Sequence, residues 1–188
     1  MKKLFMVAAF ALAAVSVNAQ NAVGQWTIQP KIGMNIANLT DSDGADARIG
    51  FVGGAELEYG ITDILGLSVG ALYSMQGAKS DDVTLKLDYI NIPILANVYV
   101  AKGFAVKLGL QPGFNVNSSL KSEGITVDLD KIDMDAKSFD LSIPVGLSYE
   151  YQSFVLDARY NWGVTKVVDG ADSKSSVFQI TLGYKFAL

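Results

Sequence analysis

The chain has 188 residues, half of them hydrophobic, and a formal net charge of −4. It contains no cysteine and no histidine, which excludes disulfides, thiolate zinc sites, histidine-ligated metals and triads with a histidine base. An acidic chain with few arginines is also a poor candidate for nucleic-acid binding. No serine–lysine or paired-aspartate constellation stands out either, so we predict a non-enzymatic protein with no catalytic, cofactor-binding or metal-site residues.

The amino-terminal segment has the pattern of an export signal. A basic start precedes an apolar run from Leu4 to Val17, and Ala19 supplies a small residue at the cleavage position. This pattern predicts a Sec signal peptide over residues 1–19 that is removed, leaving residues 20–188 as one domain. The alternative, a short membrane anchor, would need about 20 apolar residues, and the run is shorter.

Alternation of apolar and polar residues with a period of two dominates the rest of the chain. From Trp26 to Ile36, every even position is apolar and every odd position is polar or glycine. Such alternation indicates strands whose two faces meet different surroundings. The strands are long, since soluble strands have roughly 5–6 residues. In chain order, the expected strands are 26–36, 49–59, 65–75, 85–100, 104–116, 139–151, 154–164 and 178–188.

The fourth expected strand is irregular. Leu85, Leu87 and Tyr89 share one phase, whereas the apolar residues from Ile90 to Val100 share the other. The change of phase predicts a bulge near Tyr89 and Ile90, or an extension of one side beyond a membrane.

The connectors alternate between short turns and longer polar loops. In the longest, residues 118–137, Ile125, Val127 and Leu129 alternate with polar residues. We therefore expect the fifth and sixth strands to continue above the membrane as a hairpin, whose edge would bind an extended segment of a partner protein. A flexible polar loop without a partner is the alternative.

The polar face is expected to line the interior of a closed barrel. Eleven of the 18 glycines lie on that face, and the interior of an eight-stranded barrel is narrow enough for side chains to fill it. Charges on the same face are balanced, as a closed interior requires. The predicted structural ion-pair network of the lumen comprises Lys31, Arg48, Lys107, Arg159 and Lys185 with Glu56, Glu58, Asp140, Glu150 and Asp157.

Aromatic residues gather near the strand ends on the apolar face, as in the girdles of membrane barrels. The sequence thus predicts an all-β protein, an eight-stranded antiparallel up-and-down transmembrane β-barrel with short periplasmic turns and longer extracellular loops. A soluble, lipocalin-like periplasmic ligand binder with its apolar face inside is the alternative.

Two segments resemble a known family. Residues Tyr89-Ile90-Asn91-Ile92-Pro93-Ile94 resemble the Y-x-x-I-P-x strand of small outer-membrane β-barrels of Bacteroidota, the PorT-like or "porin family" proteins. Residues 158–163, Ala-Arg-Tyr-Asn-Trp-Gly, resemble the A-R-Y-x-x-G element of their penultimate strand. Size and topology are also similar to barrels of the OmpX and OmpA-transmembrane type. The resemblance implies a location in the outer membrane of a Gram-negative cell and no agreed catalytic residues.

These observations lead to three functional hypotheses. The first is a barrel whose surface loops stabilise the envelope or bind a partner, with outer-membrane lipid and lipopolysaccharide around it. The alternatives are a narrow transport channel and, from the association of PorT with secretion, an accessory barrel of a secretion system. Acidic loops at 41–46 and 128–135 can be solvated surface or can bind divalent cations, although they lack the ordered ligands of a full calcium loop.

Overall fold

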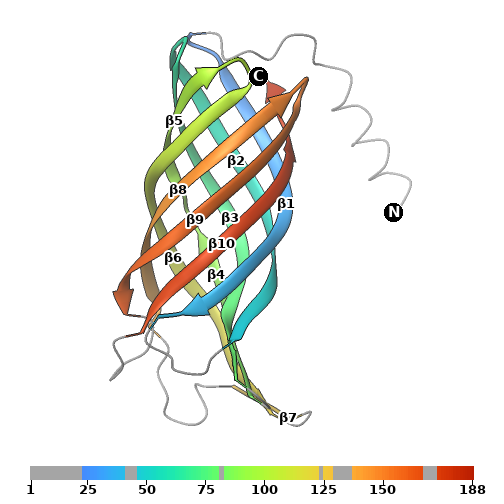
Figure 1. Ribbon diagram of the computed structural model, residues 1–188, viewed down its shortest axis with the longest axis vertical. Coiled ribbons are helices and arrows are strands. Elements are labelled where there is room, and N and C mark those ends of the chain that lie inside the picture. Colours follow the sequence, from blue (N-terminus) through green and yellow to red (C-terminus); the bar gives the residue numbers. More distant parts are fainter. Residues whose placement is uncertain (1–22, 41–45, 81–82, 123–124, 129–136, 167–172) are drawn as a thin grey trace, which may run out of the picture.

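The computed structural model describes residues 23–40, 46–80, 83–122, 125–128, 137–166 and 173–188. These residues form a closed, eight-stranded antiparallel barrel (Figure 1). No helix within the described ranges is long and apolar enough to span a membrane. The strands are β1 (Trp26–Leu39), β2 (Asp46–Thr62), β3 (Leu65–Ser80), β4 (Val83–Asn91), β5 (Ile94–Ala101), β6 (Phe104–Ser122), β7 (Ile125–Asp128), β8 (Phe139–Tyr151), β9 (Phe154–Lys166), β10 (Lys174–Tyr184) and β11 (Phe186–Ala187).

The first and last strands close the barrel. Strand β1 pairs with β2 on one side and with β10 and β11 on the other, all antiparallel. The backbone N–H of Leu188 donates to the carbonyl oxygen of Trp26 at 2.9 Å and ends this seam. The predicted all-β barrel is therefore confirmed, and each expected strand has its counterpart in the wall.

The fourth expected strand differs from the prediction. It is divided into β4 and β5 by Ile92 and Pro93, because proline has no N–H to donate to the ladder. Leu87, Tyr89, Asn91 and Leu95 are all buried, so the side-chain alternation continues across the break. Near Tyr89 the apolar residues change faces: before it they point inward, like Leu87, and after it they point outward, like Ile94.

The irregularity that the sequence located near Tyr89 lies on the opposite strand. Asp88 pairs with Asn117 while Tyr89 pairs with Asn115. Val116 is consequently an extra residue in β6, which makes it a β-bulge. Such a bulge changes the face on which every later side chain of β6 lies.

The interior is polar and crowded, as the glycine distribution predicts. Outward positions expose large apolar side chains, such as Ile32, whereas inward positions bury Lys31 and Asn35. A Cβ atom at inward-facing Gly33 would overlap the carbonyl oxygen of Ile180 on β10. Only glycine lets the neighbouring backbones approach this closely.

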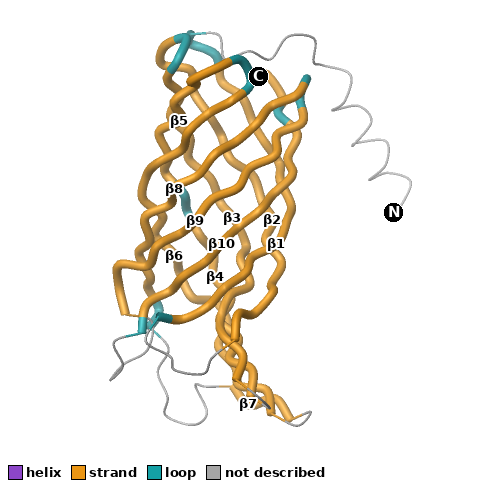
Figure 2. The backbone as a smooth tube through the Cα atoms, viewed as in Figure 1, coloured by secondary structure: helices purple, strands orange, loops and turns teal. Residues whose placement is uncertain are grey.

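The two ends of the barrel differ. At the turn end, short connections join β2 to β3, β5 to β6 and β8 to β9, and β10 and β11 finish beside β1. At the opposite end, strands continue beyond the wall, and Figure 2 shows strand structure running without interruption into this projection. We call the projecting part the extension sheet, composed of residues 76–80 of β3, 83–88 of β4, 117–122 of β6, and β7.

The extension sheet corrects the expected hairpin. Strand β6 does project, but in the projection it pairs with the separate short strand β7. Its pairing with β8, the sixth strand of the wall, lies within residues 104–114. The β3–β4 hairpin projects beside it, where a polar loop was expected between the third and fourth strands. Gly77 begins the projection with a φ of 126°, a conformation that glycine adopts far more readily than other residues.

Candidate functional site

Five charged side chains from four strands form one buried cluster in the middle of the lumen, which we call the central cluster. It consists of Lys31 of β1, Glu56 of β2, Lys107 of β6, and Asp157 and Arg159 of β9. Alternation carries each of these residues to the inside, and the barrel register brings the four strands to the same level. All five side chains are at most 4% exposed.

Arg159 organises the central cluster. Its Nε donates to Asp157 Oδ1 at 2.8 Å, and its Nη2 lies 2.8 Å from both Asp157 Oδ2 and Glu56 Oε1. Lys31 Nζ lies 2.7 Å from Glu56 Oε2, and Lys107 Nζ lies 2.7 Å from Asp157 Oδ2. Three cations thus share two carboxylates, which ties opposite sides of the lumen together and fills its cross-section.

A second ion-pair group lies at the turn end of the lumen. Lys185 Nζ is 2.8 Å from Glu150 Oε2 and 3.7 Å from Glu58 Oε2. The Tyr99 hydroxyl donates to Glu58 Oε1 at 2.6 Å and accepts from Lys185 Nζ at 3.0 Å. This group therefore links β2, β5, β8 and the end of the chain on the turn side of the central cluster.

The remaining predicted lumen residues lie toward the extension end. Arg48 donates to the carbonyl oxygen of Gln76 and lies 3.9 Å from Asp88. Asp140 accepts from the hydroxyls of Thr165 at 2.6 Å and Ser175 at 2.8 Å. Asp88 therefore lies near a cation, whereas Asp140 is held by neutral hydroxyl donors.

The ten residues expected to form the lumen network thus occupy three levels. Glu150 belongs to the group at the turn end and Asp140 to the extension end, so neither joins Arg159 in the central cluster. Sequence reasoning missed Asp88, which also accepts from Tyr73 and Asn117 at 3.0 Å, and the hydroxyl partners of Asp140. Other serines, such as Ser68 and Ser148, are also buried in the lumen, so no local signal distinguishes the hydroxyl residues that meet a carboxylate.

The extension sheet has one apolar face. Leu87 and Tyr89 are buried against each other, and Leu85 and Leu120 pack on them. Leu85 pairs directly with Leu120, and this pairing depends on the bulge at Val116, which turns Leu120 inward. The apolar face of the extension sheet thus continues the polar inner face of the wall.

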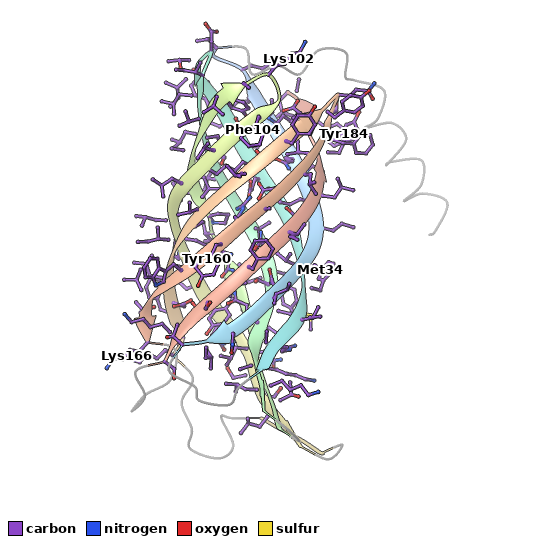
Figure 3. The ribbon with its side chains drawn as sticks, viewed as in Figure 1. Met34, Lys102, Phe104, Tyr160, Lys166 and Tyr184 are labelled. Atoms are coloured by element: carbon purple, nitrogen blue, oxygen red, sulfur yellow. The ribbon has the colours of Figure 1, made fainter. Side chains whose placement is uncertain are left out.

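The outward surface of the wall is apolar with aromatic residues at both ends. Trp26 packs on Tyr59 and Phe154 packs on Tyr184 at the turn end, with ring centroids 4.9 and 5.1 Å apart. Figure 3 shows Tyr184 and Phe104 near that end and Lys166 at the other. Phe114 and Phe139 form the corresponding pair toward the extension end. Two aromatic belts therefore bound the apolar band.

The acidic loop at 41–46 lies outside the described residues apart from the backbone of Asp46, and the loop at 128–135 lies outside them apart from the backbone of Asp128. Among the described residues, no group of three or more carboxylates is placed to hold a metal ion. The possible divalent-cation sites in these loops stay predictions.

A closed barrel with an apolar band outside, aromatic belts at both ends and paired charges inside defines a transmembrane β-barrel of the outer membrane. The family model described as "Outer membrane protein beta-barrel domain" matches residues 18–169. The chain belongs to this family, and the protein resides in the outer membrane. Short turns face the periplasm in such barrels, so the extension sheet lies on the extracellular side.

Solved structures show the same fold. Ail, the attachment invasion locus protein of Yersinia pestis, is 18% identical, with a TM-score of 0.55, covering 88% of this chain and 100% of its own. Neisserial surface protein A is 16% identical, with a TM-score of 0.53, covering 86% of this chain and 96% of its own. No curated protein sequence matches the chain. At such identities the likeness concerns the fold alone.

Proposed function

We propose that this protein is a non-enzymatic surface protein whose closed barrel anchors the extension sheet outside the cell for contact with a partner protein. The observation that carries the proposal is the direct continuation of wall strands into the extension sheet. Strands β3 and β6 run from the membrane into the projection as single elements of 16 and 19 residues. A loop attached by flexible ends would not be held in this way.

The edge of the extension sheet suits recognition by strand addition. Within the described residues, β7 pairs with β6 on one side only. The other side of such a strand offers backbone N–H and C=O groups to an extended segment of another protein. The partner would therefore be a protein with an exposed, extended segment.

The fold neighbours support a role at the surface. One is named for attachment and invasion and the other is named as a surface protein. Outer-membrane lipid and lipopolysaccharide would surround the barrel and stabilise it in the envelope.

The experiment is a deletion of residues 120–135, bridged by a Gly-Ser turn. The barrel should still fold, as shown by faster gel migration of the unboiled protein, while binding of intact cells to immobilised surface proteins of host or neighbouring cells should fall to background. Replacement of residues 167–172 by the same turn is the matched control and should leave binding unchanged. If the 120–135 deletion and the 167–172 replacement bound equally well, the extension sheet would not be the binding surface.

A narrow channel is the second candidate, favoured by unsatisfied polar groups in the lumen. The buried side-chain amides of Asn161 and Gln179 have no hydrogen-bond partner within the described chain, and such groups suit a hydrated path. The central cluster opposes it, because Lys31 and Arg159 are fully shielded there. Planar-bilayer recording separates the two: a surface anchor should give no unitary conductance, and a channel should give a stable one.

The finer affiliation with PorT-like barrels of Bacteroidota, including a possible accessory role in secretion, is a further part of this proposal. Its support is the pair of motifs at 89–94 and 158–163. Both motifs lie in the wall, where Pro93 interrupts one strand and Arg159 organises the central cluster. The two motifs thus support a shared barrel architecture. The secretion role needs its own test, which is whether a deletion strain shows a secretion defect.

A further inference from the structure

We propose that the lumen binds one small monovalent anion, such as chloride, on the extracellular side of the central cluster. Its ligands would be three buried N–H donors: Nη1 of Arg159, Nδ2 of Asn161 and Nε2 of Gln179. None of these atoms has a hydrogen-bond partner within the described chain, and the three residues are at most 2% exposed. A buried donor without a partner costs free energy, so a ligand that accepts from all three would stabilise the barrel.

Strand register brings the three donors together. Gln179 of β10 pairs directly with Arg159 of β9, and residues that face each other in an antiparallel pair have Cβ atoms about 4.5–5.5 Å apart. Asn161 follows Arg159 by two positions, so it lies on the same inner face, one step toward the extracellular end. The three side chains thus form a triangle on two neighbouring strands, and a single ion between them would be within reach of each.

The other contacts of Arg159 place Nη1 on the correct side. Nε and Nη2 donate to the two carboxylate oxygens of Asp157, which lies two positions toward the periplasmic end. Because the guanidinium is planar and this fork uses Nε and Nη2, Nη1 is the nitrogen farthest from that carboxylate. Along the strand, Asn161 lies on the opposite side of Arg159 from Asp157. Arg159 therefore keeps one charged donor for a ligand on the extracellular side.

Charge favours an anion over a neutral ligand. Three cations share two carboxylates in the central cluster, an excess of one positive charge. The group at the turn end has the opposite excess, with Lys185 between two carboxylates, but it lies on the periplasmic side. On the extracellular side, Asp140 is held by the hydroxyls of Thr165 and Ser175. A buried charge needs compensation, and one monovalent anion beside Arg159 would neutralise the excess.

The anion site goes beyond the proposed function and does not depend on it. It lies in the lumen at β9 and β10, whereas the extension sheet is built from β3, β4, β6 and β7. The amides of Asn161 and Gln179 also favour the channel candidate, but a bound anion would satisfy their N–H groups without a conducting path. Their side-chain carbonyl oxygens lack partners as well, and these acceptors suit water.

The direct test is anomalous diffraction from crystals of the folded, mature protein, grown in detergent with bromide in place of chloride. We expect a bromide peak inside the lumen, in contact with Arg159 Nη1 and with the amide nitrogens of Asn161 and Gln179. The peak should weaken in Asn161→Leu, which lacks one donor. A water at this position, or bromide bound only elsewhere, would overturn the proposal.

Urea unfolding in zwitterionic detergent is the test in solution. Sodium chloride is exchanged for sodium gluconate at constant ionic strength, so that screening stays the same, and gluconate is too large to replace chloride between these side chains. An anion that binds only the folded barrel lowers the unfolding equilibrium constant. The decrease should be about tenfold in about 0.5 M chloride, for a dissociation constant of about 50 mM.

A charge substitution then decides between an anion and water. Gln179→Glu keeps the size of the side chain and places a carboxylate directly opposite Arg159, so this variant should fold and its unfolding should no longer depend on chloride. Gln111→Glu is the matched control at another buried lumen glutamine and should keep the chloride dependence of the parent. The gel shift of unboiled protein verifies folding.

Three results in solution would overturn the anion site. The first is unfolding of the parent that does not depend on chloride. The second is a Gln179→Glu variant that keeps the full dependence. The third is a Gln179→Glu variant that does not fold, because a carboxylate at this position would then not be compensating an excess positive charge.

Discussion

The wall of the barrel and the extension sheet are built from the same strands but have opposite polarity. In the wall, β4 and β5 turn Ile90 and Ile94 outward and Asn91 inward. In the extension sheet, β4 turns Lys86 outward and buries Leu87. The outer face therefore changes from apolar to charged where the strand passes from lipid into water.

This difference teaches that the surrounding solvent, and not the strand itself, decides which face is apolar. In β4 the polarity of the two faces reverses without a break in the alternation of side chains. Inward positions are apolar in the extension sheet and polar in the wall. In β6 it also needs one extra residue, Val116, which moves Leu120 to the inner face beside Leu85. Four variants would break this arrangement to different degrees, and a fifth is expected to leave it intact.

The largest expected effect is in the inner face of the wall. Arg159→Ala would leave Asp157 and Glu56 without their shared guanidinium in the buried central cluster. Losing one partner of a buried ion pair costs about 3–5 kcal/mol of unfolding free energy, to be measured by urea unfolding in lipid vesicles. Gln111→Ala, at a buried uncharged position of the lumen, is the control. An equal loss of unfolding free energy there would show that the charges of the central cluster contribute no more than other lumen contacts.

The next effect is in the outer face of the wall. Leu110 is outward and half-exposed in the apolar band, so Leu110→Arg should cost about 2–4 kcal/mol in a bilayer. Leu110→Ala at the same position separates the charge from the lost side chain. If arginine and alanine proved equally costly, this face would not contact lipid. The measurement is again urea unfolding in vesicles.

The apolar face of the extension sheet comes third. Leu87→Ala would remove a buried side chain that packs with Tyr89, Leu85 and Leu120. We expect a loss of about 2–3 kcal/mol, near the lower end for buried leucines because the cluster is small. Hydrogen exchange should rise in residues 83–88 while the wall keeps its protection. Unaltered exchange in the extension sheet would contradict the role of this cluster.

Deletion of Val116 tests the bulge itself. Without the extra residue, Leu120 would return to the outer face and lose its contact with Leu85. Because Leu120 is only partly buried, we expect a loss of about 1–2 kcal/mol, confined by hydrogen exchange to the extension sheet. Val116→Ala keeps the bulge and should behave like the parent.

The smallest effect is expected on the outer face of the extension sheet. Lys86 is the neighbour of Leu87 on the opposite face, in water. Lys86→Leu should change the unfolding free energy by no more than about 0.5 kcal/mol. A marked stabilisation in vesicles would mean that this position contacts lipid and that the boundary lies farther out.

The sequence predicted the wall well because lipid imposes a strict rule on each strand. A position such as Leu110 must be apolar and its neighbour Gln111 must fit the lumen, so local alternation reveals both. The partners inside the lumen follow from strand register instead, which no single strand encodes. Glu56 and Arg159 are far apart in sequence and meet only because the barrel closes with a particular stagger.

The extension sheet was harder to predict for a related reason. Outside the membrane, a strand is no longer required to alternate in the same sense, and Lys79 and Thr84 look like parts of a polar loop. Their pairing in β3 and β4 depends on long-range support from β6. Leu85 and Leu87 retained a period of two, and their change of phase near Tyr89 indicated an extension beyond the membrane. Ile125 and Val127 also retained it, and they indicated the hairpin without its correct partner.

The seam between β1 and β10 has a consequence for assembly of the barrel. The residues that join there come from opposite ends of the chain, Lys31 with Gly183 and Leu39 with Ser175. Until β10 arrives, β1 and β9 both carry unpaired backbone groups that lipid cannot satisfy. Insertion is therefore an all-or-nothing event that waits for the last strand, and contacts of such long sequence separation make it slow. A ribosome that stops before Lys174 would produce a chain with no stable place in the membrane.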